Sequence, residues 1–173
     1  MSTERDTNIL ETLWEEADTN PLDTVAEIME RQNWSFECFN NTIAIEVRGQ
    51  YCVYRISIIW EEPMNAMQFC MQYDFTVHGS NLENAAETLK QVNQKLWMGH
   101  FEIPDNTHIP AFRYTTLLGG NTQATNMHQF GEILDIATSQ CERCYPAFHL
   151  LKTPQAANDE NLSLALMETK GMS

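Results

Sequence analysis

The stretch AMQFCMQYDFTV, residues 66–77, decides the fold class of this chain. Large apolar side chains occupy every second position, namely Met67, Phe69, Met71, Tyr73, Phe75 and Val77. The positions between them are held by Gln68, Cys70, Gln72, Asp74 and Thr76. Because successive side chains of a strand point to opposite faces, the pattern predicts an extended strand with one buried face and one solvated face.

Three further strands are expected before this stretch. The alternation recurs over residues 34–39, 42–48 and 51–60, and short polar segments separate these runs. The pair Asn40-Asn41 suits a two-residue hairpin, since Asn tolerates a positive φ. Four consecutive strands with short turns predict an antiparallel meander, and residues 101–103 and 112–118 predict a later hairpin.

Helices are expected on either side of these strands. Asn20-Pro21-Leu22-Asp23 combines a cap, a first-turn proline and an acid, which predicts a helix ending near Gln32. Ser80-Asn81-Leu82-Glu83 has the pattern of a capping box, and the helix that it opens has an apolar stripe reaching Leu96. A long helix is expected from about Thr125, kinked or ended by Pro146, and a short one over residues 162–169.

A structural corner is expected where the second of these helices returns to the sheet. Gly99 would take a left-handed conformation that closes the helix, and Phe101 would re-enter the core. Trp97 and His100 belong to the same corner. Together the elements predict an α+β fold, an antiparallel sheet (four-strand meander plus a later hairpin) with helices packed on one face.

The 173 residues have the length of one domain. We expect an acidic, partly flexible N-terminal lead over residues 1–19, a single α+β domain over 20–151, and a linker with a short helix over 152–173. Residues 1–30 hold nine acidic residues and one basic residue. This acidic end either aids solubility or binds a basic partner.

The charge of the chain argues against two classes of partner. The formal net charge of −14 repels the phosphates of nucleic acid and the surface of anionic membranes. The N-terminus lacks the pattern of a signal peptide, and no apolar run approaches the ~20 residues that cross a bilayer. Five cysteines without a disulfide-framework spacing fit a reducing compartment, so we expect a cytoplasmic protein.

The only motif with recognisable chemistry is the CxxC of Cys141 and Cys144. It falls inside the expected long helix, on its apolar stripe, where the helix dipole does not favour a thiolate. Buried core thiols are therefore the main interpretation, with redox or zinc chemistry as alternatives. The five histidines show no metal-ligand spacing, and no catalytic fingerprint is present, so we expect no catalytic residues, no cofactor and no metal.

The third expected strand has apolar residues on both faces. Tyr51, Val53 and Ile59 lie on the face opposite Tyr54, Ile56 and Ile58. Only one face can meet the helices of this domain, so the first three residues form a candidate interaction surface. We expect a homodimer that uses this sheet face or a neighbouring helix and edge strand. The alternative is that the N-terminal segment or the 162–169 helix covers them.

Four segments together carry a family resemblance: Asn20–Asp23, Asn93–Phe101, Phe112–Leu118 and Cys141–Phe148. In this order they resemble the YbjN-domain family of bacteria, described as sensory transduction regulators, over about residues 20–150. The resemblance implies a fold similar to class I type III secretion chaperones, which are small acidic dimers that bind client polypeptides. The family provides no catalytic residues to carry over, and Cys144 departs from the bulky aromatic residue expected there.

Two functions from different classes follow. The first is a non-catalytic bacterial cytoplasmic protein-interaction module, chaperone-like or regulatory, that binds a client or partner protein as a homodimer. The alternative is a small-molecule sensor or cryptic enzyme with a pocket near Asn93, His100 and Arg113. Arg113 discriminates between them, because an exposed or acid-paired arginine favours the first and a deep cavity shared with His100 favours an anionic ligand.

Overall fold

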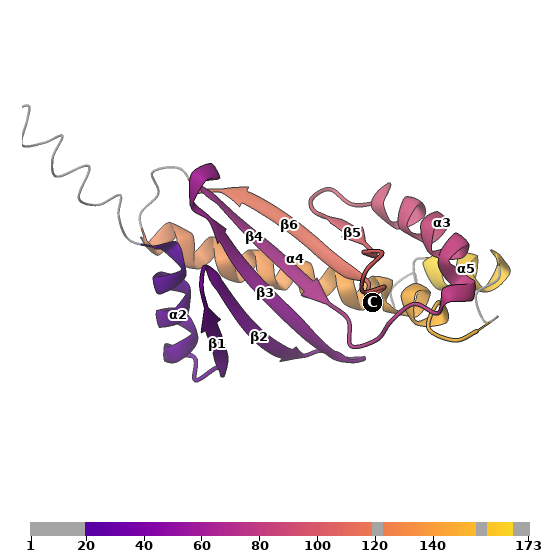
Figure 1. The fold of residues 1–173 in the computed structure, drawn as a ribbon, viewed down its shortest axis with the longest axis horizontal. Coiled ribbons are helices and arrows are strands. Elements are labelled where there is room, and N and C mark those ends of the chain that lie inside the picture. The colour runs from indigo at the N-terminus through magenta and orange to yellow at the C-terminus, as the bar shows by residue number, and fades with distance from the viewer. Residues whose placement is uncertain (1–19, 119–122, 155–158, 168–173) are drawn as a thin grey trace, which may run out of the picture.

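The computed structural model describes residues 20–118, 123–154 and 159–167. Its centre is a six-stranded sheet with the order β1-β2-β3-β4-β6-β5 (Figure 1). The strands are β1 Phe36–Phe39, β2 Thr42–Arg48, β3 Val53–Glu61, β4 Ala66–Gln72, β5 His100–Glu102 and β6 Ala111–Leu117. All neighbours are antiparallel, and the later hairpin joins the four-strand meander through the pairing of β6 with β4.

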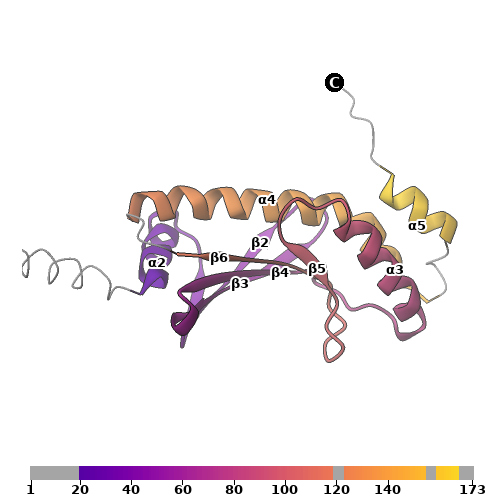
Figure 2. The ribbon, with the colours of Figure 1, turned by 90° about the horizontal axis from the view of Figure 1, so that it is seen from above.

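The helices lie on one face of this sheet, which confirms the predicted fold class. They are α2 Pro21–Arg31, α3 Leu82–Asn93, α4 Gln123–Leu150 and α5 Asp159–Leu166, with short 3₁₀ turns at Glu62–Met64 and Gly79–Asn81. Figure 2 shows α4 running along one face of the sheet and no described helix along the opposite face. The described helices therefore cover only one side of the sheet.

A single row of side chains shows how the core is built. Cross-strand pairing places Ile45, Ile56, Met71, Phe112 and Phe101 opposite one another on five neighbouring strands. Each of them is at most 3% exposed. Helix α4 covers the row, and the rings of Phe101 and Phe148 lie 5.0 Å apart. Burial of this apolar surface, at ~25 cal/mol per Å², is the main force holding helix to sheet.

The start of α2 is as the sequence predicts. The side-chain oxygen of Asn20 accepts the backbone N–H of Leu22 at 3.0 Å, and Pro21 occupies the first turn. The helix ends at Arg31, and its stripe of Leu22, Val25 and Met29 is buried against the sheet and α4.

The segment 66–77, expected to be one strand, leaves the sheet earlier than the alternation predicts. Pairing of β4 ends at Gln72, yet Tyr73, Phe75 and Val77 remain buried while Asp74 and Thr76 are exposed. Backbone bonds to the β5–β6 connection replace the ladder, from Tyr73 N–H to Pro110 and from Val77 N–H to His108. The alternation therefore reports an extended, half-buried backbone, whether or not that backbone belongs to a sheet. The other strand ends also differ, since β1 begins at Phe36 and β3 at Val53.

Two expectations about helix ends are wrong. Ser80 does not form a capping box: its hydroxyl lies 2.9 Å from Nδ1 of His78. Asn81 is 2% exposed, and its amide donates to the carbonyls of Leu151 and Thr153, which ties α3 to the end of α4. Helix α3 ends at Asn93 rather than near Leu96.

Helix α4 continues through Pro146 to Leu150, because a long apolar face keeps this segment packed on the sheet. The regular helix therefore does not end at the proline.

The corner before β5 is confirmed in its main feature. Gly99 has φ +68°, and Phe101 is 2% exposed. The glycine does not close α3, which has already ended six residues earlier. Trp97 takes no part in the packing, since its side chain is fully exposed.

The first testable prediction concerns Gly99. A Cβ at this position would meet the ring of Phe112 and the carbonyl oxygen of Arg113, in addition to the strain of a positive φ. We expect Gly99→Val to lower the free energy of unfolding by about 2 kcal/mol or more. Urea denaturation measures this.

Gly131→Ala is the matched control, because a Cβ there meets nothing within 4 Å and the residue lies inside α4. It should raise stability by up to ~1 kcal/mol. Equal stability of Gly99→Val and wild type would contradict the corner described here.

Candidate functional site

The face of the sheet that carries no helix is the candidate functional surface, and we call it the open face. Alternation along each strand assigns its residues. They are Glu37, Phe39, Thr42, Ala44, Glu46, Arg48, Val53, Arg55, Ser57, Ile59, Glu61, Ala66, Gln68, Cys70, Gln72, His100, Glu102, Ala111, Arg113, Thr115 and Leu117.

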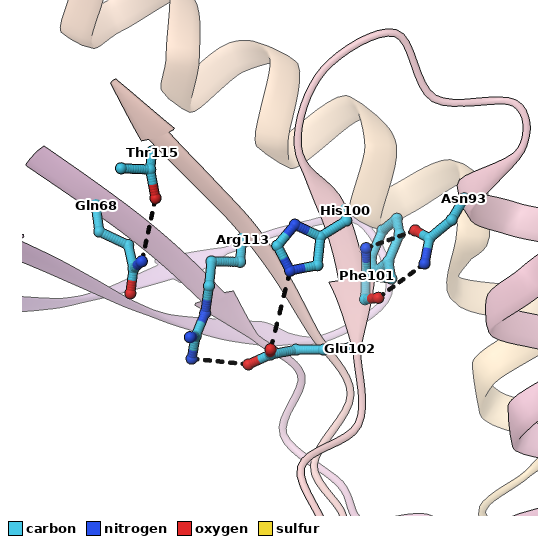
Figure 3. Close-up of polar contacts among 7 residues, drawn as sticks. All are labelled: Gln68, Asn93, His100, Phe101, Glu102, Arg113 and Thr115. Atoms are coloured by element: carbon cyan, nitrogen blue, oxygen red, sulfur yellow. Dashed lines mark hydrogen bonds and ion pairs between the residues drawn. The ribbon is translucent and has the colours of Figure 1, made fainter. Parts of the chain in front are cut away.

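Polar side chains on the open face pair with one another across the strands. Gln68 donates to the hydroxyl of Thr115 at 3.1 Å, and Arg55 lies 3.5 Å from Glu46 (Figure 3 draws the first pair). The strongest contact joins Arg113 to Glu102 at 2.7 Å. Opposite charges are therefore neutralised within the face.

His100 and Arg113 come together, as the alternative function required, but an acid lies between them. The two residues pair across β5 and β6, and both reach the carboxylate of Glu102 (Figure 3). The His100–Glu102 distance is 3.9 Å, an ion pair only when the imidazole is protonated. The Arg113 side chain is about one-third exposed and its charge is paired with Glu102, as the first function predicts, whereas its buried Nε has no hydrogen-bond partner among the described residues.

The environment of Arg113 also affects a cysteine. Cys70 is the direct cross-strand neighbour of Arg113 on the open face and is 7% exposed. Burial raises the pKa of the Cys70 thiol, and the positive charge of Arg113 offsets part of that rise. The thiol therefore remains protonated, which makes it a poor nucleophile.

Asn93 lies away from this cluster and has a structural task. Its side-chain oxygen accepts the N–H of Phe101 at 2.7 Å, and its amide donates to the Phe101 carbonyl at 3.0 Å (Figure 3). Asn93 thus satisfies both backbone groups of Phe101 at the outer edge of β5, as a neighbouring strand would. These bonds occupy the amide that the alternative pocket would have used.

The three candidate interaction residues separate into two places. Val53 and Ile59 lie on the open face and are half-buried. Tyr51 precedes β3, and its ring stacks on that of Tyr145 of α4 with centroids 4.8 Å apart. Next to it, the N–H of Gln50 donates to the carboxylate of Glu142 at 2.8 Å, so this turn is fastened to α4.

Apolar side chains gather at one end of the open face. Ile59 pairs with Thr42, which pairs with Phe39 on its other side, and Leu117 follows two strands away. Phe39 and Leu117 are 54% and 74% exposed, respectively. The opposite end of the face holds the charged pairs. The first end, which we call the apolar end, also holds the exposed Glu61, in the cross-strand row of Leu117.

Glu102 is the important residue that sequence reasoning missed. A signal was present, because Glu102 lies two positions from His100 in the predicted hairpin and therefore shares its face. The pairing register of β5 with β6 was needed to place that face beside Arg113.

The CxxC cysteines are core residues, as predicted. Cys141 and Cys144 are 0% and 4% exposed. Burial raises the pKa of the Cys141 thiol well above its usual value and that of Cys144 to about 11. Among the described residues, no group of three or more His, Cys, Asp or Glu side chains is placed to hold a metal ion.

These positions predict how the thiols react. A bulky aromatic disulfide at pH 8 should label the exposed Cys38 quickly and leave Cys141 and Cys144 unlabelled in the native protein. Both should react once urea unfolds the chain. Because the unfolded thiols ionise before the folded ones, the thiol contribution to stability should fall as pH rises from about 9 towards 11. Rapid native labelling of either buried thiol would contradict the assignment.

The bonds of Asn93 predict a second result. Asn93→Leu leaves the N–H and C=O of Phe101 without partners, which should cost about 1–3 kcal/mol of unfolding free energy. Amide exchange at Phe101 should accelerate in the folded protein. Gln94→Leu, at an exposed neighbouring position, is the control and should change neither quantity. Unaltered exchange in Asn93→Leu would show that the side chain does not protect the edge.

The fold of this chain resembles that of a protein of known structure. The chain is similar in structure to YbjN, "a putative transcription regulator from E. coli", with a TM-score of 0.51 and 16% sequence identity. The match covers 77% of this chain and 96% of that one, and at this identity it shows the fold alone. No curated protein sequence matches the chain. None of the described helices has the length and apolar character of a membrane span.

A family model identifies the chain more directly. The YbjN model, described as "Putative bacterial sensory transduction regulator", matches residues 21–150, which include α2, the whole sheet and α4. The match extends over well more than half of the chain, and it includes the four segments that carry the resemblance except for Asn20. This protein belongs to the YbjN family.

Proposed function

We propose that this protein is a non-catalytic regulatory protein of the bacterial cytoplasm that acts by binding protein partners, and that it forms a homodimer through its open face. The observation that carries the proposal is the charge of that face. It holds three arginines (Arg48, Arg55 and Arg113) and four glutamates (Glu37, Glu46, Glu61 and Glu102), a formal charge of −1, whereas the chain carries −14.

Two strongly acidic chains repel each other less where the surfaces that meet are nearly neutral. Like charges across an interface cost several kcal/mol, and this face limits that cost because two of its glutamates are paired with its own arginines. The Glu46–Arg55 and Glu102–Arg113 pairs are made within one chain, so they need no partner to neutralise them.

Burial of the apolar end of the face would favour association of two chains. Each large apolar side chain that leaves water contributes roughly 1.5–3 kcal/mol. Phe39, Ile59 and Leu117 are three such side chains, spread over β1, β3 and β6, and a second sheet could pack across these strands at the usual ~10 Å spacing. A two-fold dimer would place these residues against their own copies.

A regulatory task fits this surface better than catalysis. The candidate polar residues are used within the fold: Arg113 pairs with Glu102, and Asn93 bonds the backbone of Phe101. The family description as a regulator supports the same conclusion. A chaperone-like function would use the same face to hold a client polypeptide.

Light scattering at micromolar concentration tests the dimer. Wild type should show a mass near 40 kDa, twice the 19.9 kDa of the chain. Leu117→Asp and Ile59→Asp place an unpaired charge at the apolar end, and each should weaken the dimer by 10-fold or more.

Leu164→Asp is the control, because Leu164 is similarly exposed (62%) but lies on α5, away from the open face. It should leave the mass unchanged. A dimer that survives Leu117→Asp and Ile59→Asp excludes the open face as its interface. A monomeric wild type removes the dimer and leaves the face for a different protein.

A further inference from the structure

The outer edge of β2 has no strand beside its last residues. Strand β1 begins with Phe36, opposite Ile45, and the chain before it turns towards α2. Figure 1 shows β2 extending beyond β1. Residues 46–48 therefore pair with β3 on one side and with no described strand on the other. We call this side of residues 46–48 the vacant edge.

A groove runs along the vacant edge. It measures about 770 Å³, within the ~300–1,000 Å³ range of ligand sites. Apolar surface comes from Trp34, Phe36 and Val47, each of which is exposed or half-buried. Charged surface comes from residues of the open face, among them the exposed Glu46 and Arg48. The groove is therefore open to solvent and has both apolar and charged walls.

The backbone of β2 presents hydrogen-bonding groups to this groove. The carbonyl of Asn41 accepts the N–H of Trp60 from β3. Because the backbone groups of successive residues point to opposite sides of a strand, those of Val47 also point to β3. Those of Glu46 and Arg48 then point to the vacant edge. An extended peptide beside β2 would pair with both residues.

The side chains along the groove determine which peptide fits. In antiparallel pairing, three successive peptide residues face Arg48, Val47 and Glu46, in this order. Arg48 forms no ion pair within the described part of the chain, so it favours an acidic residue. Val47 and Trp34 line the groove with apolar surface and favour an apolar residue. Glu46 already pairs with Arg55, so a neutral polar residue suits the third position.

A second copy of this chain fits the vacant edge less well than a free peptide does. Two β2 edges paired about Val47 would bring the turn after β2 of one copy opposite Ile45 of the other, where Phe36 already lies. This turn is fastened to α4, since the N–H of Gln50 donates to Glu142 at 2.8 Å. A peptide can end or bend away at the same point.

We propose that the vacant edge binds an extended segment of a partner protein by strand addition, with an acidic, an apolar and a polar residue facing Arg48, Val47 and Glu46. Main-chain bonds provide affinity in this mode, and the alternate side chains provide specificity. The inference rests on the proposed function, because it names the kind of partner that the regulatory protein binds. It does not use the apolar end of the open face, so peptide binding and dimer formation can be measured separately.

Fluorescence anisotropy with the full-length protein tests the specificity. The probes are two labelled peptides, Gly-Ser-Glu-Ile-Thr-Ser-Gly and the same sequence with Lys in place of Glu. Wild type should bind the Glu peptide about five-fold more tightly, and Arg48→Glu should reverse this preference. The net charge of −14 favours the Lys peptide, so a preference for Glu arises locally.

Arg143→Glu is the matched control variant, because it makes the same charge change at an exposed site on α4, outside the groove. It should keep the wild-type preference for the Glu peptide.

Methylated peptides test the strand pairing itself. N-methylation of the peptide Glu removes an N–H that faces the carbonyl of Arg48, and it should weaken binding by about ten-fold or more. N-methylation of the peptide Ile is the control, because its N–H points away from β2, and it should leave the affinity unchanged. These peptides need no protein variant, so they decide the question if Arg48→Glu does not fold.

Amide hydrogen exchange locates the binding site. Residues 1–19, the expected acidic lead, lie outside the described residues, so the free protein is measured first. There the amide of Arg48 should exchange several-fold faster than that of Val47, which points into the ladder with β3. Saturation with the Glu peptide should slow exchange at Arg48 and leave that of Val47 unchanged.

Three results would overturn the proposal. The first is equal affinity of wild type for the Glu and Lys peptides, including binding of neither. The second is equal binding of the two methylated peptides. The third is an Arg48 amide that is already protected in the free protein: the chain itself then covers the edge, or a second copy does if dilution removes the protection.

Leu117→Asp separates this proposal from the dimer. Leu117 lies at the apolar end of the open face and outside the groove, so the variant should bind the Glu peptide as wild type does. A dimeric wild type that binds neither peptide overturns strand addition and leaves the proposed function standing. A monomeric wild type that prefers the Glu peptide removes the dimer and supports strand addition.

Discussion

The structure depends on one constraint: the apolar side chains of five strands must arrive on the same face of the sheet in register. Ile45, Ile56, Met71, Phe112 and Phe101 meet this constraint through pairings that span more than fifty residues of sequence. A slip of one residue in any strand would turn its apolar side chains towards the open face and its polar ones towards α4. Helix α4 can lie flat across the sheet because each of these five strands presents apolar side chains to it.

The same register builds the open face as a consequence. Once Phe101 faces α4, its neighbours His100 and Glu102 must face away, and the pairing of β5 with β6 brings them beside Arg113. Asn93 and Gly99 hold this edge in place, the first by bonding the backbone of Phe101 and the second by allowing the corner before it. Polar residues that could be taken for catalytic ones therefore have structural tasks. Arg113 and Glu102 neutralise each other on the open face, and Asn93 holds the edge of the sheet. This is consistent with a regulatory member of the YbjN family.

In the part of the chain that the structure describes, helices cover one side of the sheet and leave the open face exposed. The open face is nearly neutral, whereas the chain as a whole carries a formal net charge of −14.

The sequence by itself determined the elements and the faces. Period-two alternation identified the strands and their buried sides, and Asn20-Pro21 located the start of α2, because these signals act over a few neighbouring residues. Only the tertiary structure decided which distant groups meet. Ser80-Asn81 has the pattern of a local cap, yet the Asn81 amide donates to carbonyls just after α4, and Arg113 pairs with Glu102 of another strand. Such contacts depend on register and on the packing of elements far apart in the chain, which no short stretch of residues encodes.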